Sequence, residues 1–92
     1  MIYRHEDQSV DLTKVTRLYP AALISAGGES AQVSLEWADS KADKVTLECY
    51  VLICDFDPVG EVPVNRIELK FVTKEELFGA MNEISTLLSK KD

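Results

Sequence analysis

Two aspartates separated by one residue are the strongest candidates in this chain for metal binding or catalysis. Asp55 and Asp57 follow an apolar run, residues 51–54, and stand immediately before Pro58. Carboxylates at the end of a strand can hold a divalent cation, or divide the work of nucleophile and acid–base catalyst. Acidic residues before a proline and a glycine are also ordinary turn formers, and this structural interpretation competes with the catalytic one.

The run of residues 51–58, an apolar strand ending in Asp-Phe-Asp, resembles the first motif of haloacid-dehalogenase-type phosphatases. The resemblance implies that Asp55 is a nucleophile, that Asp57 is an acid–base catalyst, and that both hold magnesium. Pro58 and Val59 stand where Gly-Thr normally follows, and only 35 residues remain after position 57 of 92. That length is too short for the Rossmann-like fold and later motifs of the family. A metal-dependent hydrolase using Asp55 and Asp57 is therefore the alternative hypothesis.

The remaining metal-binding or nucleophilic residue types are one histidine, His5, and two cysteines, Cys49 and Cys54. The cysteines share an apolar run at an odd spacing, so in a strand they point to opposite faces and cannot form a disulfide with each other. With His5 expected at the surface near the terminus, a zinc site lacks ligands. We therefore predict no metal or cofactor site. Free, buried thiols fit a reducing compartment, which favours a cytoplasmic protein.

Aromatic residues suggest a contact surface. Trp37 is in phase with Val33 and Leu35, which predicts that it packs in the core. Tyr50 is out of phase with the apolar residues that precede it, so it is expected on the other face of its strand. We predict that Tyr19 and Tyr50 form an interaction patch on an outer sheet face.

Residues 73–90 predict one amphipathic helix. Thr73 and Glu76 have the spacing of a capping box, and Val72 and Leu77 have that of a hydrophobic staple. Lys90 and Lys91 suit the C-terminal end of the helix dipole. At 100° per residue one stripe is apolar, with Phe78 at its margin: Leu77, Ala80, Met81, Ile84, Leu87 and Leu88.

Gly79 is the anomaly of this helix, because it lies in the middle and on the polar side. An exposed mid-helix glycine costs about 1 kcal/mol relative to alanine. One interpretation is tolerated sequence drift, and the other is close approach of a second chain. Gly79 therefore joins Tyr19 and Tyr50 as a candidate interaction residue.

The elements before the helix predict a curved antiparallel sheet of four to five strands. Residues 15–25, 30–38, 45–56 and 66–72 are the expected strands, with a turn at Gly27-Gly28. Pro20 indicates an edge position, a bulge or a break in the first of them. The segment before residue 15 predicts either a short strand or a helical turn beneath the sheet. The sequence thus predicts one α+β domain, residues 1–92, closed by its C-terminal helix.

The phrase at residues 10–20, which opens Val-Asp-Leu-Thr, resembles small bacterial pleckstrin-homology-like domains, as does the closing helix announced by a capping box. The resemblance implies a bent antiparallel sheet plugged by the helix, forming a partly open barrel. Such families bind peptides, proteins or phosphoinositides. This chain has room for four or five strands, where the family has seven, and it has no basic pocket for a lipid.

Composition limits the choice of partner. Of 92 residues, 46% are apolar and the net charge is −6, so the chain is globular and repels nucleic acid and anionic lipid. No stretch approaches the 18 apolar residues of a membrane span. The leading hypothesis is a non-catalytic protein-interaction domain, with a homodimer as one form of it. A third hypothesis is an acidic inhibitor or immunity-type protein that blocks a basic partner.

Overall fold

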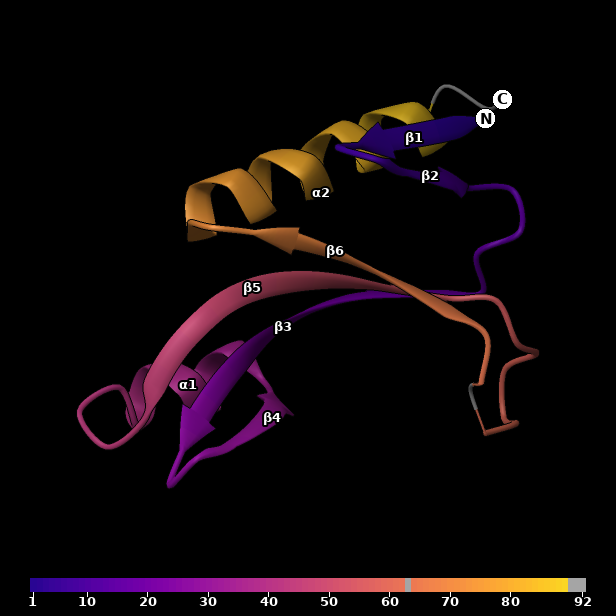
Figure 1. Cartoon of the computed structure of the whole chain (residues 1–92). Coiled ribbons are helices and arrows are strands. Elements are labelled where there is room, and N and C mark those ends of the chain that lie inside the picture. Colours follow the sequence, from indigo (N-terminus) through magenta and orange to yellow (C-terminus); the bar gives the residue numbers. More distant parts are fainter. Residues whose placement is uncertain (63, 90–92) are drawn as a thin grey trace.

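The computed structural model describes residues 1–62 and 64–89 and shows an α+β fold with two antiparallel sheets (Figure 1). The larger sheet has the strand order β4-β3-β5-β6, and the smaller is a β1–β2 hairpin. In the described residues the larger sheet is open and does not close into a barrel. The elements are β1 (Ile2–His5), β2 (Gln8–Asp11), β3 (Arg17–Ala26), β4 (Glu29–Val33), α1 (Leu35–Ser40), β5 (Thr46–Asp55), β6 (Arg66–Phe71) and α2 (Lys74–Ser89).

Strands β3 and β5, each ten residues long, form the centre of the larger sheet and pair through nine residues of each strand. Strand β4 pairs only with residues 22–26 of β3, so the first half of β3 is an edge on that side. Pro20 lies in this unpaired half, which is the edge position that its missing N–H group favours. The tight turn between β3 and β4 has positive φ at Gly27 (59°) and Gly28 (85°), as a type I′ hairpin requires.

The prediction of a strand over residues 30–38 is wrong in its second half. Strand β4 ends at Val33, and Ser34 becomes the N-cap of α1, its hydroxyl oxygen accepting from the Trp37 amide at 3.1 Å. Leu35 and Ala38, three residues apart, then face the sheet. Trp37 is 41% exposed, so its expected core position is also wrong. The alternation of apolar residues at positions 33, 35 and 37 is compatible with a strand, but the Ser34 cap starts a helix there instead.

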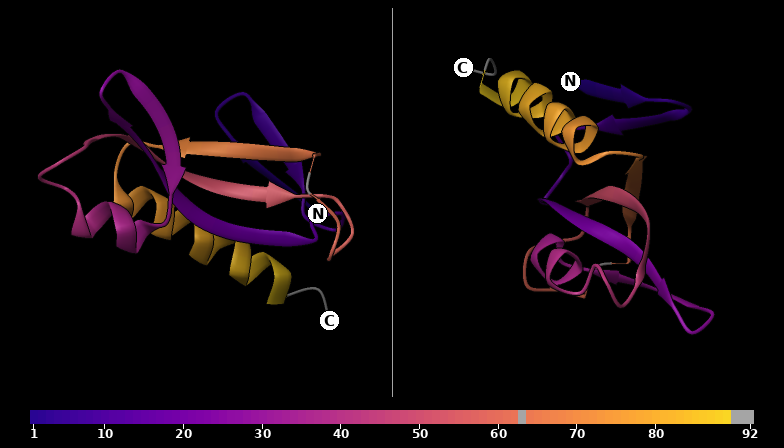
Figure 2. Two further views of the ribbon diagram at one scale, coloured as in Figure 1. Left: turned by 90° about the horizontal axis from the view of Figure 1, so that it is seen from below. Right: turned by 90° about the vertical axis from the view of Figure 1, so that its left-hand side faces the viewer.

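The first residues of the chain resolve into the β1–β2 hairpin, which docks on the core. Its turn places Glu6 at φ 54°. Tyr3, Val10 and Leu12 are buried and pack with α2 and the larger sheet. Figure 2 shows α2 and the hairpin lying together on one side of that sheet. We call the sheet face toward them the inner face and the opposite one the outer face.

Helix α2 confirms most of the predicted stripe, because Leu77, Ala80 and Ile84 are buried against Leu52, Leu69 and Phe71 of the sheet. The Thr73 hydroxyl oxygen accepts from the Glu76 amide at 3.2 Å, as the capping box predicts. Leu88 is 43% exposed, so its place in the stripe was wrong, and Val72 is 79% exposed, so the staple does not pack. The predicted role of Lys90 and Lys91 lies outside the described residues.

Short helix α1 covers the other end of the inner face, where Ala22, Ile24 and Ala38 form a small buried cluster. Lys74, at the start of α2, reaches Asp39 of α1 in a 2.8 Å ion pair. The inner face is thus occupied along its length by α2, the hairpin and α1. In the described part of the chain, neither helix has the length and apolar character needed to cross a membrane.

Candidate functional site

The outer face of the sheet carries an apolar patch made by β3 and β5 alone. Ala21, Val51 and Ile53 are buried, and Tyr19, Leu23 and Cys49 around them are half-buried. These six residues, the outer strip, alternate along their strands and lie opposite one another in the register: Tyr19 with Ile53, Ala21 with Val51, and Leu23 with Cys49. Among the described residues, neither helix belongs to this cluster. Strand β5 is therefore apolar on both faces, but only its inner face is covered by helices and the hairpin.

Charged side chains border the outer strip. At one end Asp55 lies between Arg17 and Arg66 on the neighbouring strands. The Arg17 guanidinium stands 4.9 Å from the centre of the Tyr19 ring, a cation–π contact that fixes the ring at the rim of the patch. Along β6, Glu68 lies opposite Ile53 and Lys70 lies opposite Val51. An apolar centre with a charged rim is the composition typical of protein interfaces.

Tyr50 does not share this face with Tyr19, so the predicted Tyr19–Tyr50 patch is wrong. Tyr50 packs on the inner face, in contact with the clusters beneath α1 and α2. The cause is a register shift: Leu23 pairs with Cys49, but its neighbour Ile24 pairs with Leu47. The extra residue is a β-bulge, which reverses the alternation within β5 and turns Tyr50 inward.

The two cysteines lie on opposite faces, as predicted, and both are free. On the outer face, burial raises the pKa of the Cys49 thiol; Lys70 lowers it in part, while Glu48 and Glu68 raise it further. On the inner face, burial and then the charge of Asp55 raise the pKa of Cys54 to about 11. The thiolate is the reactive form, so neither cysteine is poised as a nucleophile near neutral pH.

The two aspartates of the catalytic alternative have separate surroundings. One carboxylate oxygen of Asp57 accepts from the backbone amides of Val64 and Asn65, each at 2.7 Å, and the other accepts from the Asn65 side-chain amide at 3.0 Å. These hydrogen bonds, that from the Asn65 backbone first, lower the pKa of Asp57. Asp57 therefore braces the loop between β5 and β6. Asp55 is 1% exposed, and its nearest cation is Arg66 at 3.5 Å.

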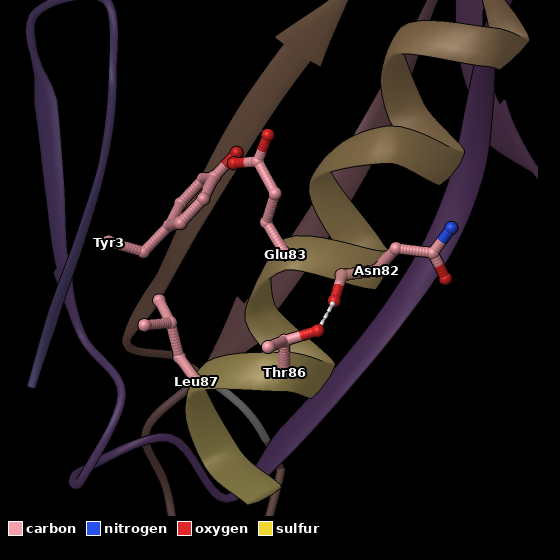
Figure 3. Close-up of a pocket in the computed structure, with 5 residues that line it drawn as sticks. All are labelled: Tyr3, Asn82, Glu83, Thr86 and Leu87. Carbon is pink, nitrogen blue, oxygen red and sulfur yellow. Dashed lines mark hydrogen bonds between the residues drawn. The ribbon is translucent and has the colours of Figure 1, made fainter. Parts of the chain in front are cut away.

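A second surface feature lies between β1 and α2. One hollow of about 420 Å³ is lined by Tyr3, Asn82, Glu83, Thr86 and Leu87 (Figure 3). A neighbouring hollow of about 310 Å³ shares two of these residues, Tyr3 and Glu83, so we treat both as one β1–α2 groove. The second hollow is lined by Tyr3, His5, Phe71, Glu76, Gly79, Ala80 and Glu83.

Gly79, singled out as an anomaly of the helix, lies in this groove. His5, which we expected at the surface near the terminus, also lines the groove and is half-buried. Its Nε2 lies 2.8 Å from the Lys70 carbonyl oxygen, and its ring centre lies 4.3 Å from that of Phe71. No sequence pattern predicted the groove itself, because the groove depends on where the β1–β2 hairpin docks.

In comparisons with known proteins, no family model, no curated protein and no solved structure matches the chain. The resemblance to pleckstrin-homology-like domains therefore stays a prediction. The observed sheet is curved, antiparallel and covered by a C-terminal helix.

Proposed function

We propose that this protein is a non-catalytic interaction domain that binds a protein partner through the outer strip. The observation that carries the proposal is the apolar outer strip of β3 and β5, in which half-buried side chains surround a buried centre and over which no helix packs within residues 1–62 and 64–89. Tyr19 and Leu23 are half-buried at its margin and present apolar area to solvent. Covering such area on binding contributes about 25 cal/mol per Å².

The inner face cannot serve this purpose, because α2, the hairpin and α1 already fill it. The rim of the outer strip provides both signs of charge, with Arg17, Arg66 and Lys70 beside Asp55 and Glu68. Charges of both signs orient a partner and add specificity more than affinity. The free cysteines, with their raised pKa, suit a reducing compartment, and we place the domain in the cytoplasm as part of this proposal.

Site-specific photocrosslinking tests the proposal. A photoreactive benzoylphenylalanine replaces Tyr19 in cells of the native host, and Trp37, which is 41% exposed and lies on α1 at the inner face, serves as the control position. We expect protein crosslinks from position 19 that disappear when Leu23→Gln is added, and none from position 37. A crosslinked mass of two chains, with a dimer in sedimentation velocity, identifies the partner as a second copy. Equal crosslinking at both positions, or none at position 19, would refute the proposal.

The catalytic alternative is weaker, because the Asp57 carboxylate is engaged within its loop and Asp55 is buried. A magnesium titration followed by NMR separates the two: shifts at Asp55, Phe56 and Asp57 would favour a hydrolase. The inhibitor hypothesis requires acidic residues gathered on one surface. On the outer face they alternate with Arg66 and Lys70, which argues against that surface as the inhibitory one.

A further inference from the structure

The β1–α2 groove has acidic walls with apolar and aromatic surface between them. Glu76 and Glu83 stand two helical turns apart on α2, about 10 Å along the axis. Tyr3 comes from β1, and Leu87 from the last turns of α2. Of the residues lining the two hollows in the described structure, none is lysine or arginine. The negative charge of the groove is therefore not balanced from within its own lining.

Glu83 is the central acidic group, because it lines both hollows. Figure 3 shows its carboxylate directed toward the hydroxyl of Tyr3, with Leu87 below the tyrosine ring. Thr86 turns its hydroxyl away from this pair and donates to the Asn82 carbonyl oxygen at 2.9 Å. Burial raises the pKa of Tyr3, and the charge of Glu83 together with a hydrogen bond to its carboxylate raises this pKa further.

Gly79 keeps the groove open. A β-carbon at this position would meet no atom within 4 Å, so the space above the helix backbone is empty. Any larger side chain would project into it. The glycine that helix propensity disfavours thus leaves room between Glu76 and Glu83.

We propose that the β1–α2 groove is a second binding site, which receives a lysine or arginine side chain of a protein partner. The aliphatic stem of such a side chain packs on Tyr3 and Leu87, and its charged head pairs with Glu83. The tyrosine ring adds a cation–π attraction. The net charge of −6 steers a basic partner toward the domain, and Glu76 extends the attraction along the groove.

An NMR titration of the full chain with the peptide Ac-Ser-Lys-Ser-Lys-Ser-NH₂ tests the proposal, with Ac-Ser-Gln-Ser-Gln-Ser-NH₂ as the uncharged control. We expect saturable amide shifts at Tyr3, Gly79, Glu83 and Leu87 with the lysine peptide only. Shifts with both peptides, or shifts from the lysine peptide scattered over all acidic residues, would overturn the proposal.

Matched variants separate the groove from general attraction by an acidic chain. Glu83→Gln removes one charge from the groove and should weaken binding of the lysine peptide about fivefold to tenfold. Glu75→Gln removes the same charge from an exposed neighbouring position that lines neither hollow, and it should change binding less than twofold. An equal effect of the two variants would refute a specific site.

Gly79→Leu provides a test by steric block. Leucine is a better helix former than glycine, so the variant should fold while its side chain fills the groove and abolishes peptide binding. The outer-strip variant Leu23→Gln should leave peptide binding unchanged, since it belongs to the other face of the sheet. If Gly79→Leu is folded by circular dichroism and still binds the lysine peptide, the groove is not the site.

Discussion

Replacing Gly79 by alanine should stabilise the protein by about 0.5–1 kcal/mol. Gly79 is the sixth of sixteen residues in α2, more than a turn from either end, so the helix propensity difference applies in full. The added methyl group would meet no atom within 4 Å and causes no strain. Alanine also restricts the unfolded chain more than glycine does. For a domain of 92 residues the gain corresponds to an increase in Tm of about 3–5 °C.

Urea denaturation at equilibrium, followed by far-ultraviolet circular dichroism, measures this change as a higher midpoint at an unaltered slope. Gly28→Ala is the matched control, because Gly28 has φ 85° in the β3–β4 turn and its variant should lose about 1–2 kcal/mol. If Gly79→Ala proved neutral or destabilising, the helix at this position would need glycine for a reason internal to the fold. The account of Gly79 as a residue that only keeps the groove open would then be wrong.

Three further outcomes follow from burial and hydrogen bonding. Ile84→Ala should lower the free energy of unfolding by about 2–5 kcal/mol, since Ile84 is 1% exposed, whereas Ser85→Ala on the exposed side should change it by less than about 0.5 kcal/mol in the same urea titration. Because the folded state raises the pKa of Cys54 from 9.0 to about 11, its contribution to stability is complete below pH 9 and should be lost as pH rises toward 11. The Cys54→Val variant should lack this alkaline loss, and Ellman's reagent should label Cys49 before Cys54. Asp57 contributes in the opposite sense, because its lowered pKa gives stability that is lost as pH falls below 3.8. The Asp57→Ala variant should show faster hydrogen exchange at the backbone amides of Val64 and Asn65, which donate to the Asp57 carboxylate.

The parts of the fold that the sequence predicted correctly are those determined by residues close together in the chain. Helix α2 has its own cap at Thr73 and a buried stripe of 3.6-residue period, so no distant contact was needed to recognise it. The turn at Gly27-Gly28 was equally clear, since paired glycines supply positive φ. Strand β6, at the edge of the sheet beside β5, kept strict alternation, with Leu69 and Phe71 turned inward.

The errors arose where one alternating apolar pattern was compatible with two local structures, and contacts elsewhere in the fold determined which of them formed. Leu35 and Trp37 continue the alternation of β4, yet the Ser34 cap starts a helix there. Alternation in β5 likewise predicted an outward Tyr50, until the bulge beside Cys49 reversed it. The β1–α2 groove depends on contacts between residues more than 60 positions apart, such as His5 with Lys70. Local sequence patterns cannot predict contacts of this kind.

Asp55 is a buried charge at the end of the outer strip, so substitutions there should change the free energy of unfolding. It is 1% exposed, and neither of its carboxylate oxygens has a hydrogen-bond partner among the described residues. Arg66 Nε lies 3.5 Å from one oxygen, within ion-pair distance but without the geometry of a hydrogen bond. Arg17 is the neighbour on the other side. Removing a buried carboxylate from water costs several kcal/mol, and a pair of this geometry repays that cost incompletely.

Two substitutions therefore should act in opposite directions. Arg66→Met leaves the buried charge of Asp55 with less compensation and should cost about 1–3 kcal/mol, below the usual cost of breaking a buried pair because Arg66 is 32% exposed to screening solvent. Asp55→Val continues the apolar strip with a β-branched residue and should leave stability unchanged or raise it by up to about 2 kcal/mol. In the double variant the cost of Arg66→Met should largely vanish, a coupling that urea denaturation of all four proteins measures directly. A loss of more than 2 kcal/mol in Asp55→Val alone would show that the carboxylate is well solvated by hydrogen bonds, and that this end of the strip is polar in the free protein.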